Sequence, residues 1–397
     1  MVFTMRILNI VHDDKFIDGL ISEYDHFGID STFIVIQHDC ERPLKYIKNT
    51  SRVKCVLVGT KEYEFFQKAE SYDVIWVHFL DASKMEFVNN IPVELNEKKV
   101  VVWSAWGSDL YGIVNLQCLR RRTFCQLLRS VSIRGAARLI VQQLFGMVGI
   151  TRKCYDARVR KFVNRVDFCS AIVPGESRFL QRIMKRSANI IDFCYGDLND
   201  NKIRYPIVDL NQKNIWLGNS ATYTNNHFDV LAQMKELAGY QIIAPLSYGD
   251  AAEIINKCGH NCFGERWKPI LDFMSLHSYL AKMAKCSIFV FPHIRQQALG
   301  NILLALKIGG CLFMDHRNPV ATMLRKRNIT VYDISLLKGK SINECLSDFK
   351  TRQIDNVSRS YKLYDDREII SVLESSFKKI EKLVVRRKSE KLKNKGV

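Results

Sequence analysis

The feature that most constrains the fold is a repeated alternation of short apolar runs with longer segments of helical periodicity. In the first half the apolar runs lie at residues 6–12, 31–37, 53–59, 73–79, 99–104 and 168–174, with helix-like segments such as 16–27 and 83–90 between them. These runs are nearly continuous in apolar residues, which is typical of parallel strands buried on both faces of a sheet. The sequence therefore predicts an α/β protein whose parallel strands are covered by helices.

The second half repeats the pattern, which predicts a second domain. Strand-like runs lie at 214–218, 240–245, 287–291, 311–315 and 330–332, and helix-like segments at 226–238, 251–257, 277–285, 301–308 and 319–327. A polar stretch at 196–202 is typical of a linker. A chain of 397 residues, 47% of them hydrophobic, can fill two cores. We expect two doubly wound, Rossmann-like domains facing each other across a cleft, at 1–197 and 198–360, and a helix with a basic tail at 361–397 that can cross back to the first.

The cysteines and the N-terminus indicate the compartment. The 12 cysteines are scattered and several lie in apolar runs, which fits reduced thiols of a cytosolic protein rather than a disulfide framework. The one tight cluster, Cys258-Gly259-His260-Asn261-Cys262, has no second Cys/His pair at a suitable spacing, so we expect no metal. The first apolar run is too short for a secretion signal, and no run reaches the ~20 apolar residues of a membrane span. We expect a soluble or peripheral protein.

The charge is strongly positive, at +18, and is concentrated in two segments. Residues 119–165 hold many arginines and lysines against a single acid, Asp156, and the tail at 378–397 is also rich in lysine and arginine. The first segment carries apolar residues at helical spacing, namely Leu139, Ile140, Leu144, Phe145, Met147 and Val148. An apolar stripe beside clustered arginines suits a helix lying on an anionic membrane. A helix packed on the core with solvated charges is the alternative.

Polar side chains follow three strand-like runs of the second half, where ligands of doubly wound domains bind. The turn after 287–291 brings an arginine and two glutamines to the start of an apolar helix, which favours an anion site because helix N-termini present free N–H groups and arginine grips phosphate in two places. An ordinary turn with a surface arginine is the alternative. The candidate donor-binding residues are Gly218, Asn219, Ser220, Asn226, Pro245, Tyr248, Arg295, Gln296, Gln297, Gly300 and Asn301. Together they favour a nucleoside diphosphate.

In the first half, the most distinctive turn follows the run at 99–104. Trp106, Gly107, Asp109 and Tyr111 offer aromatic faces that stack on a sugar and a carboxylate that accepts its hydroxyls. Asp109 is the first candidate for a catalytic base, and capping of the next helix is its alternative role. His12, after the first run, is the second candidate, although a lone histidine is more often structural.

These motifs together resemble the bacterial 4-α-L-fucosyltransferase family, glycosyltransferase family 56. The resemblance spans about residues 100–324. The matching residues are Trp106-Gly107-Ser108-Asp109-Leu110-Tyr111, Leu217-Gly218-Asn219-Ser220, Asn226-His227, Pro245 with Tyr248, Arg295-Gln296-Gln297 with Gly300, and Asn318-Pro319. Ala298 stands where the family tends to have glycine.

The resemblance implies a GT-B glycosyltransferase at the cytoplasmic face of the bacterial inner membrane. It would move a 4-acetamido-4,6-dideoxyhexose from a dTDP-sugar or similar nucleotide sugar to a polyprenyl-diphosphate-linked glycan, as in enterobacterial common antigen or O-antigen synthesis. No metal cofactor is expected, because cationic groups neutralise the leaving diphosphate. Arg295 and the N–H groups near Gly300 would hold the diphosphate, Trp106, Gly107 and Tyr111 would meet the acceptor, and Asp109 or His12 would be the base.

Two other functions remain open at this point. One is a GT-B enzyme of another family that uses a UDP- or GDP-sugar on lipopolysaccharide. The other is a basic α/β module that binds polyanions without catalysis, which the charge alone would permit. Nucleic acid is not expected, because the arginines of 119–165 alternate with aliphatic rather than with stacking aromatic residues.

Overall fold

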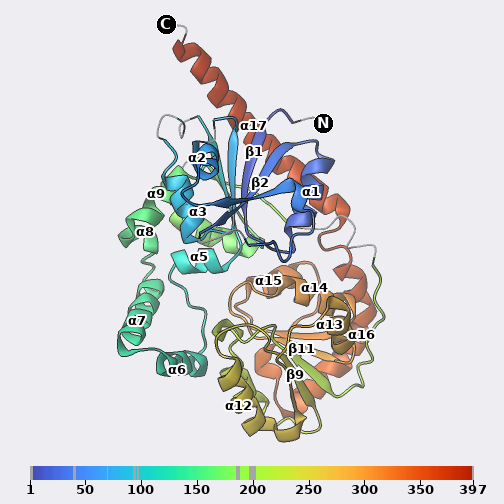
Figure 1. The fold of residues 1–397 in the computed structure, drawn as a ribbon. Helices are drawn as coiled ribbons and strands as arrows, with labels where there is room; N and C mark the ends of the chain where they lie inside the picture. Colours follow the sequence, from blue (N-terminus) through green and yellow to red (C-terminus); the bar gives the residue numbers. More distant parts are fainter. Residues whose placement is uncertain are drawn as a thin grey trace. The chain divides into compact units, whose positions relative to one another are not determined.

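A computed structural model describes residues 3–38, 42–68, 70–92, 95, 98–184, 188–195 and 203–395, of which 339–340 and 391–395 are described by their backbone alone. The chain divides into two compact units, coloured along the sequence in Figure 1. Unit 1 comprises Met1–Leu116, Phe145–Lys202 and Tyr364–Val397, and unit 2 comprises Gln117–Leu144 and Ile203–Leu363. The sequence analysis placed 117–144 in the first domain, whereas in the structure this segment belongs to unit 2. The expected linker at 196–202 lies outside the described residues.

Unit 1 contains a fully parallel sheet. Its described strands are β1 (Arg6–Val11), β2 (Asp30–Gln37), β3 (Val53–Leu57), β4 (Val74–His78), β5 (Val100–Ala105), β6 (Phe168–Ala171) and β7 (Asn189–Ile190), in the order β3-β2-β1-β4-β5-β6-β7. The chain builds outward from β1 and then returns to add β4 on the other side of β1. Doubly wound sheets bind ligands at such a reversal, beyond the carboxyl ends of the strands on either side, which here are β1 and β4.

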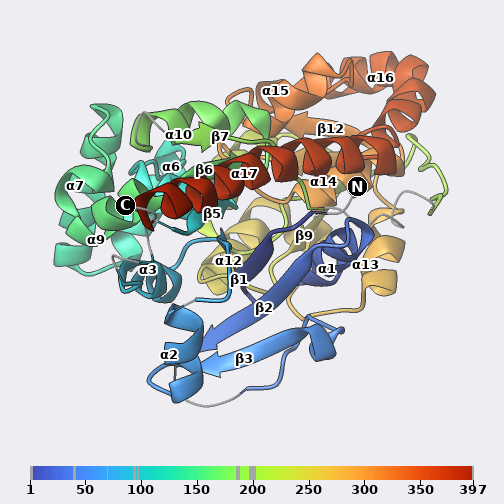
Figure 2. The same ribbon diagram turned by 90° about the horizontal axis from the view of Figure 1, so that it is seen from above.

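Helices cover both faces of this sheet, and the central strands β1, β4 and β5 are accordingly buried along almost their whole length (Figure 1). They are α1 (Ile17–His26), α2 (Lys61–Lys68), α3 (Ala82–Asn89), α5 (Ser108–Ile113), α8 (Arg152–Tyr155), α9 (Ala157–Arg165), α10 (Ser177–Ile183) and α17 (Asp366–Lys395). The last of these comes from the C-terminal end of the chain and lies across the sheet of unit 1 in Figure 2.

Apolar packing and ion pairs attach α17 to unit 1. Phe377 is fully buried, with its ring 5.6 Å from that of Phe3 and 5.3 Å from that of Tyr24. The Nη2 atom of Arg387 donates to Oδ1 of Asp167 at 2.8 Å. The crossing back that the sequence allowed is therefore present, and this basic side chain is paired within the protein.

Unit 2 contains a second parallel sheet with the same kind of reversal. Its described strands are β8 (Asn214–Leu217), β9 (Gln241–Pro245), β10 (Trp267–Ile270), β11 (Ile288–Phe291), β12 (Cys311–Met314) and β13 (Tyr332–Asp333), in the order β10-β9-β8-β11-β12-β13. The helices include α11 (His227–Met234), α12 (Ala252–Phe263), α13 (Leu276–Met283), α14 (Leu299–Lys307), α15 (Pro319–Lys326) and α16 (Gly339–Ser360). The reversal lies between β8 and β11, so a ligand is expected at their carboxyl ends.

The basic segment of the sequence forms α6 (Arg121–Ser130) and α7 (Ile133–Met147). Unit 2 holds the start of α6, because the carboxylate of Asp229 accepts from N of Arg122 at 3.0 Å and from N of Thr123 at 2.8 Å. On α7 the apolar side chains are largely exposed, with Ile133 at 90% and Met147 at 73%. The alternative of a core-packed helix is therefore wrong for these side chains. None of the described helices meets the length and apolarity required to cross a bilayer.

We predict that Phe377→Ala destabilises unit 1 by about 3–5 kcal/mol, because a fully buried aromatic ring is lost and a cavity remains. Thermal unfolding followed by circular dichroism should show a clearly lowered midpoint. Ile354→Ala is the control, since this side chain is 65% exposed on α16 and its loss should change the midpoint little. An unchanged midpoint for Phe377→Ala would show that α17 is not part of the stable core.

Candidate active site

The turn between β11 and α14 presents a helix N-terminus at the sheet reversal of unit 2. Ala298 is the N-cap residue of α14 and has a φ of 59°, a left-handed conformation that glycine adopts more easily. Ala298 therefore holds a backbone conformation that a glycine would adopt with less strain. No side chain caps this end of α14. Free N–H groups in a first helical turn attract an anion.

Asn318 fixes this turn to the next strand end. Its Nδ2 donates to the carbonyl oxygen of His293 at 2.9 Å and to that of Arg295 at 3.1 Å, while its Oδ1 accepts from N of Val320 at 2.8 Å. Arg295 is half-buried, and its Nη1 donates to the carbonyl oxygen of Gln296 at 3.1 Å. The backbone that carries the Arg295 guanidinium is thus held from two sides.

Glycine is required where β8 ends. Gly218 has a φ of 70°, and a Cβ atom there would lie 2.6 Å from Oδ1 of Asn225. The same space holds the ring of His227, which is buried and makes no hydrogen bond within the described residues. Burial lowers the pKa of His227 to about 3, so the ring is neutral. A buried polar ring without a partner is commonly satisfied by a bound molecule.

Amide side chains join three strand ends of unit 2. Asn219 donates through Nδ2 to Oη of Tyr248 at 2.6 Å, and its Oδ1 accepts from Nε2 of Gln297 at 3.1 Å. Nε2 of His293 lies 3.1 Å from the same Oδ1 and 2.8 Å from Oδ1 of Asn225, so that nitrogen carries the proton. Burial, with the charge of Arg295, lowers the pKa of His293 well below its usual value. These residues therefore form a neutral framework around the reversal.

Several predicted donor-binding residues support loops instead of facing a ligand. Asn226 is fully buried, and its Oδ1 accepts from N of Arg120 at 2.7 Å while its Nδ2 donates to the carbonyl oxygen of Pro292 at 3.2 Å. Oγ of Ser220 accepts from Nδ2 of Asn225 at 2.9 Å. The remaining predicted residues differ in exposure: Pro245 and Gln296 are buried, and Tyr248 and Gly300 are exposed. Nδ2 of Asn301 donates to Oη of Tyr279 at 3.1 Å.

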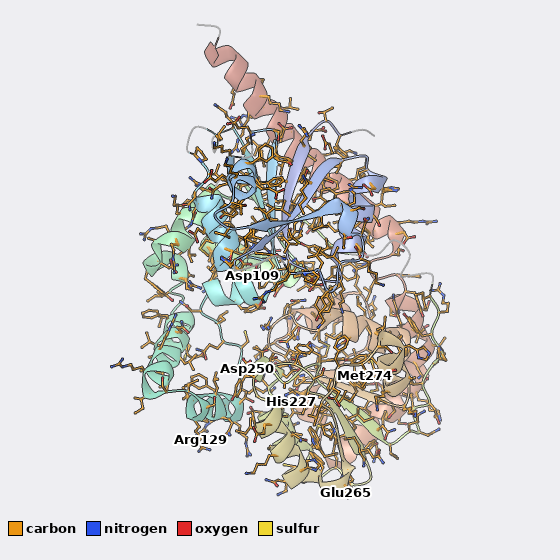
Figure 3. All side chains as sticks on the ribbon, in the orientation of Figure 1. Asp109, Arg129, His227, Asp250, Glu265 and Met274 are labelled. Carbon is orange, nitrogen blue, oxygen red and sulfur yellow. The ribbon has the colours of Figure 1, made fainter. Side chains whose placement is uncertain are left out.

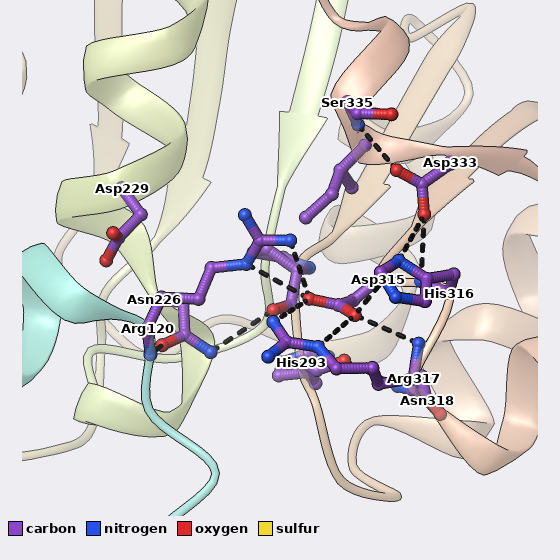
Figure 4. Close-up of polar contacts among 12 residues, drawn as sticks. Arg120, Asn226, Asp229, His293, Asp315, His316, Arg317, Asn318, Asp333 and Ser335 are labelled. Atoms are coloured by element: carbon purple, nitrogen blue, oxygen red, sulfur yellow. Dashed lines mark hydrogen bonds and ion pairs between the residues drawn. The ribbon is translucent and has the colours of Figure 1, made fainter.

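A cluster that the sequence did not indicate lies at the end of β12 (Figure 4). Asp315 is fully buried, and its Oδ2 accepts from Nη2 of Arg120 at 2.7 Å and from Nη2 of Arg317 at 2.8 Å. Burial would raise the pKa of Asp315, but the hydrogen bonds and charges of the two arginines lower it to about 2. One carboxylate between two guanidinium groups leaves a positive charge at the strand end. Arg120 had been assigned only to the membrane-binding segment, since nothing in the sequence pairs it with Asp315.

In unit 1, Asp109 is a structural carboxylate by its contacts (labelled in Figure 3). Its Oδ2 accepts from N of Leu80 at 2.9 Å and from Nε1 of Trp103 at 3.1 Å, and its Oδ1 accepts from N of Trp106 at 2.9 Å. Burial raises its pKa. The carboxylate thus ties the turns after β4 and β5 together, and its oxygens already accept several hydrogen bonds.

The other predicted residues of unit 1 differ in their exposure to solvent. Tyr111 is buried and lies 5.4 Å from the ring of Phe179, so it packs in the core and does not face an acceptor. Gly107 is the N-cap residue of α5 with a φ of 103°. Trp106 is half-buried. His12 has a side chain that is 40% exposed, and its Nε2 lies 3.0 Å from Oδ2 of Asp81.

Most of the chain matches one known protein family. Residues 90–364 match the family described as 4-alpha-L-fucosyltransferase, glycosyl transferase group 56. This protein belongs to that family. It is therefore a glycosyltransferase, an activity that uses a nucleotide-sugar donor and a glycan acceptor.

The solved structures similar to this fucosyltransferase-family protein have the GT-B fold. They include sucrose-phosphate synthase from Thermosynechococcus elongatus, with a TM-score of 0.65 and 12% identity over 95% of this chain and 99% of the other. A glycosyltransferase from Rickettsia africae has a TM-score of 0.59 and 11% identity over 95% and 98% of the two chains. An alpha-glucosyltransferase in complex with UDP and DNA has a TM-score of 0.57 and 13% identity over 95% and 99%. The two doubly wound units are thus those of a GT-B glycosyltransferase.

The described part of this family member contains no group of three or more His, Cys, Asp or Glu side chains that could hold a metal ion. The Cys258–Cys262 cluster lies within a single helix, α12. The ability to act without a metal stays a prediction.

We predict that Asp315→Asn lowers the stability of this glycosyltransferase by about 3 kcal/mol, because two guanidinium groups lose a buried counter-charge. Thermal unfolding at pH 7 measures the change. Asp348→Asn is the matched control, because that carboxylate is exposed and pairs with Arg352, and its loss should change the midpoint little.

The difference in stability between wild type and Asp315→Asn should depend on pH. The pKa of folded Asp315 is about 2, below that of an unfolded aspartate, so its stabilising effect is complete above about pH 4 and is lost as the pH falls toward 2. The difference between wild type and Asp315→Asn should shrink over that range. A difference that stays constant to pH 2 would contradict the assignment.

Proposed function

We propose that this enzyme transfers a 4-acetamido-4,6-dideoxyhexose from a dTDP-sugar to a polyprenyl-diphosphate-linked glycan in bacterial surface polysaccharide synthesis. The observation that carries the proposal is the positive charge at the sheet reversal of unit 2. Arg295, Arg120 and Arg317 lie on connected turns there, with Asp315 as counter-charge and the uncapped start of α14 beside Arg295. Family membership supports the sugar class.

The excess of positive charge fits a nucleoside diphosphate as the leaving group. Three guanidinium groups and the carboxylates of Asp315 and Asp333 leave about one positive charge at these strand ends. Negative charge grows on the diphosphate as the sugar departs, so contacts with it strengthen in the transition state. The lowered pKa values of His293 and His227 keep both rings neutral, so the arginines carry the positive charge at these strand ends. The unpartnered ring of His227 beside Gly218 adds a polar group for the donor.

Unit 1 would supply the acceptor side. The transferred sugar must reach a hydroxyl of the acceptor glycan, and a base must take the proton of that hydroxyl. Asp109 is a poor base because its oxygens already accept hydrogen bonds from Leu80, Trp103 and Trp106. His12 is more exposed and lies at the sheet reversal of unit 1, so we give it the role of base.

A polyprenyl-linked acceptor also requires the enzyme to reach a membrane surface. On α7, Ile133, Leu144 and Met147 are exposed at 90%, 54% and 73%, and the exposed Arg134 and Arg138 lie on the same helix. Apolar side chains that enter the interface beside arginines that meet anionic headgroups are the usual features of a peripheral helix. We propose that α7 binds the cytoplasmic face of the inner membrane.

We predict that Arg295→Ala lowers kcat by about a hundredfold to a thousandfold, because a cationic contact with the leaving diphosphate is lost. The assay combines bacterial lipid-linked acceptors with dTDP-, UDP- and GDP-sugars and detects the glycolipid by mass spectrometry. Arg352→Ala, an exposed arginine on α16, is the control and should retain activity. Wild-type turnover in Arg295→Ala would sink the donor assignment, and product from a UDP- or GDP-sugar alone would reject the dTDP donor.

We predict that the double variant Ile133→Asp and Met147→Asp binds anionic vesicles at least tenfold more weakly, because two exposed apolar contacts become negative. Co-sedimentation with phosphatidylglycerol-containing vesicles measures binding. The control is Phe273→Asp with Leu276→Asp, which changes equally exposed apolar residues, at 75% and 70%, outside the basic segment. Equal loss in both double variants, or none in either, would contradict membrane binding through α7.

A further inference from the structure

His12 and Asp81 meet at the point where the sheet of unit 1 reverses. His12 directly follows β1, and Asp81 ends the loop that follows β4, the neighbouring parallel strand. Nε2 of His12 lies 3.0 Å from Oδ2 of Asp81, and the two side chains are 40% and 28% exposed. Parallel strands bring their carboxyl ends to the same edge, which explains how residues 69 positions apart become neighbours. Both side chains are accessible at a ligand-binding position of the fold.

Capping alone does not require the charge of Asp81. Asp81 is the N-cap residue of α3, and its Oδ1 accepts from N of Lys84 at 2.8 Å. Asparagine caps helices about as well as aspartate does, so capping requires an oxygen but not a carboxylate. The second oxygen, Oδ2, lies 3.0 Å from Nε2 of His12 and 4.0 Å from Nζ of Lys84. One side chain therefore caps α3 and places its negative charge closest to His12, with Lys84 as a more distant partner.

The charged groups around His12 single out Asp81. On the histidine's own loop, Asp13 accepts from the backbone N of Tyr46 at 2.9 Å and of Ile47 at 3.0 Å, and Asp14 accepts from N of Phe16 at 3.2 Å. Among the described residues, Lys15 on that loop interacts with Asp14, and Lys84 interacts with Asp81.

Lys84 is buried, and its Nζ donates to the carbonyl oxygens of His78 at 2.7 Å and Phe79 at 3.0 Å. Burial lowers the pKa of Lys84 to about 7. Burial would raise the pKa of Asp81, but the hydrogen bond with His12 and the charge of Lys84 lower it, so Asp81 stays ionised.

Aromatic side chains line the approach to His12. The ring of Phe79 lies 4.9 Å from the imidazole and 6.1 Å from the ring of Trp106, which in turn lies 6.0 Å from Phe16. Phe79 has a φ of 59°, a strained conformation for a bulky residue, and such strain concentrates at functional sites. Phe16 is 39% exposed. Aromatic faces beside a proton-accepting group suit the C–H surface and hydroxyls of a sugar.

We infer that Asp81 is the positioning residue for His12, accepting the proton of its Nε2 so that Nδ1 faces the acceptor hydroxyl as the base. This inference rests on the proposed function. As the acceptor oxygen bonds to the anomeric carbon, its proton passes to Nδ1. The bond from that carbon to the phosphate oxygen breaks, and its electron pair leaves with the nucleoside diphosphate. Asp81 remains ionised and stabilises the imidazolium ion that forms, as expected for a carboxylate that orients a histidine base.

The test is Asp81→Asn, which keeps a capping oxygen and removes the charge. We expect kcat to fall at least a hundredfold while KM for the donor changes less than about twofold, because only the step that charges His12 is affected. Asp156→Asn is the matched control, because Asp156 caps α9 in the same unit by accepting from N of Arg158 at 3.0 Å. It should retain activity.

A second background, the His12→Gln variant, separates a positioning role of Asp81 from a general loss of activity through damage to the fold. In His12→Gln, adding Asp81→Asn should lower kcat little further, because a residue that acts only through His12 has no effect without it. Equal losses of kcat in both backgrounds, or an unchanged kcat in Asp81→Asn alone, would overturn the inference. Failure of the wild-type enzyme to form any glycolipid with the lipid-linked acceptors and sugar nucleotides would instead reject the proposed function itself.

Discussion

The buried carboxylate of Asp315 holds two guanidinium groups that would otherwise repel each other. Arg317 is its neighbour in the sequence, whereas Arg120 is 195 positions away and belongs to the segment before α6. An unpaired charge at this depth would be costly, so the three groups are stable only together. The pairing places positive charge at the end of β12 and at the same time fixes the inserted segment 117–144 to unit 2. The charge of the candidate donor site and the attachment of α6 therefore share one interaction.

Both units have residues with a left-handed backbone near their sheet reversals. Phe79 follows β4 with a φ of 59°, Asn226 precedes α11 with a φ of 51°, and Ala298 precedes α14 with a φ of 59°. For Phe79 and Ala298 this conformation is unfavourable and persists where surrounding contacts enforce it. At Asn226 the contacts are hydrogen bonds to Arg120 and Pro292. Packing and hydrogen bonding therefore shape the turns at the strand ends where doubly wound domains bind their ligands.

Much of the fold and part of the site follow from local sequence patterns. Apolar runs such as 100–104 became buried strands, since an uninterrupted apolar run is stable only with cover on both faces. The turns at Gly218 and Arg295 were singled out because their residue types are adjacent in the sequence and follow a strand. Other candidate residues make contacts within the protein that the sequence did not indicate. Tyr111 and Asn226 have side chains suited to binding, but tertiary contacts use them for packing and for joining loops. The residue type limits the interactions that a side chain can make, and its neighbours in the folded protein determine which of them form.

By itself, the sequence determined two parallel α/β halves, their helices and the strand, turn and helix around Arg295, because these depend on periodicity and on residues close together in the chain. The tertiary structure alone decided which carboxylates are occupied and which charges meet. Asp109 receives donors from Leu80 and Trp103, and Asp81 approaches His12 across two strands. These contacts join residues far apart in the sequence, and their energies depend on burial and on distances of a few ångströms, neither of which a linear pattern contains.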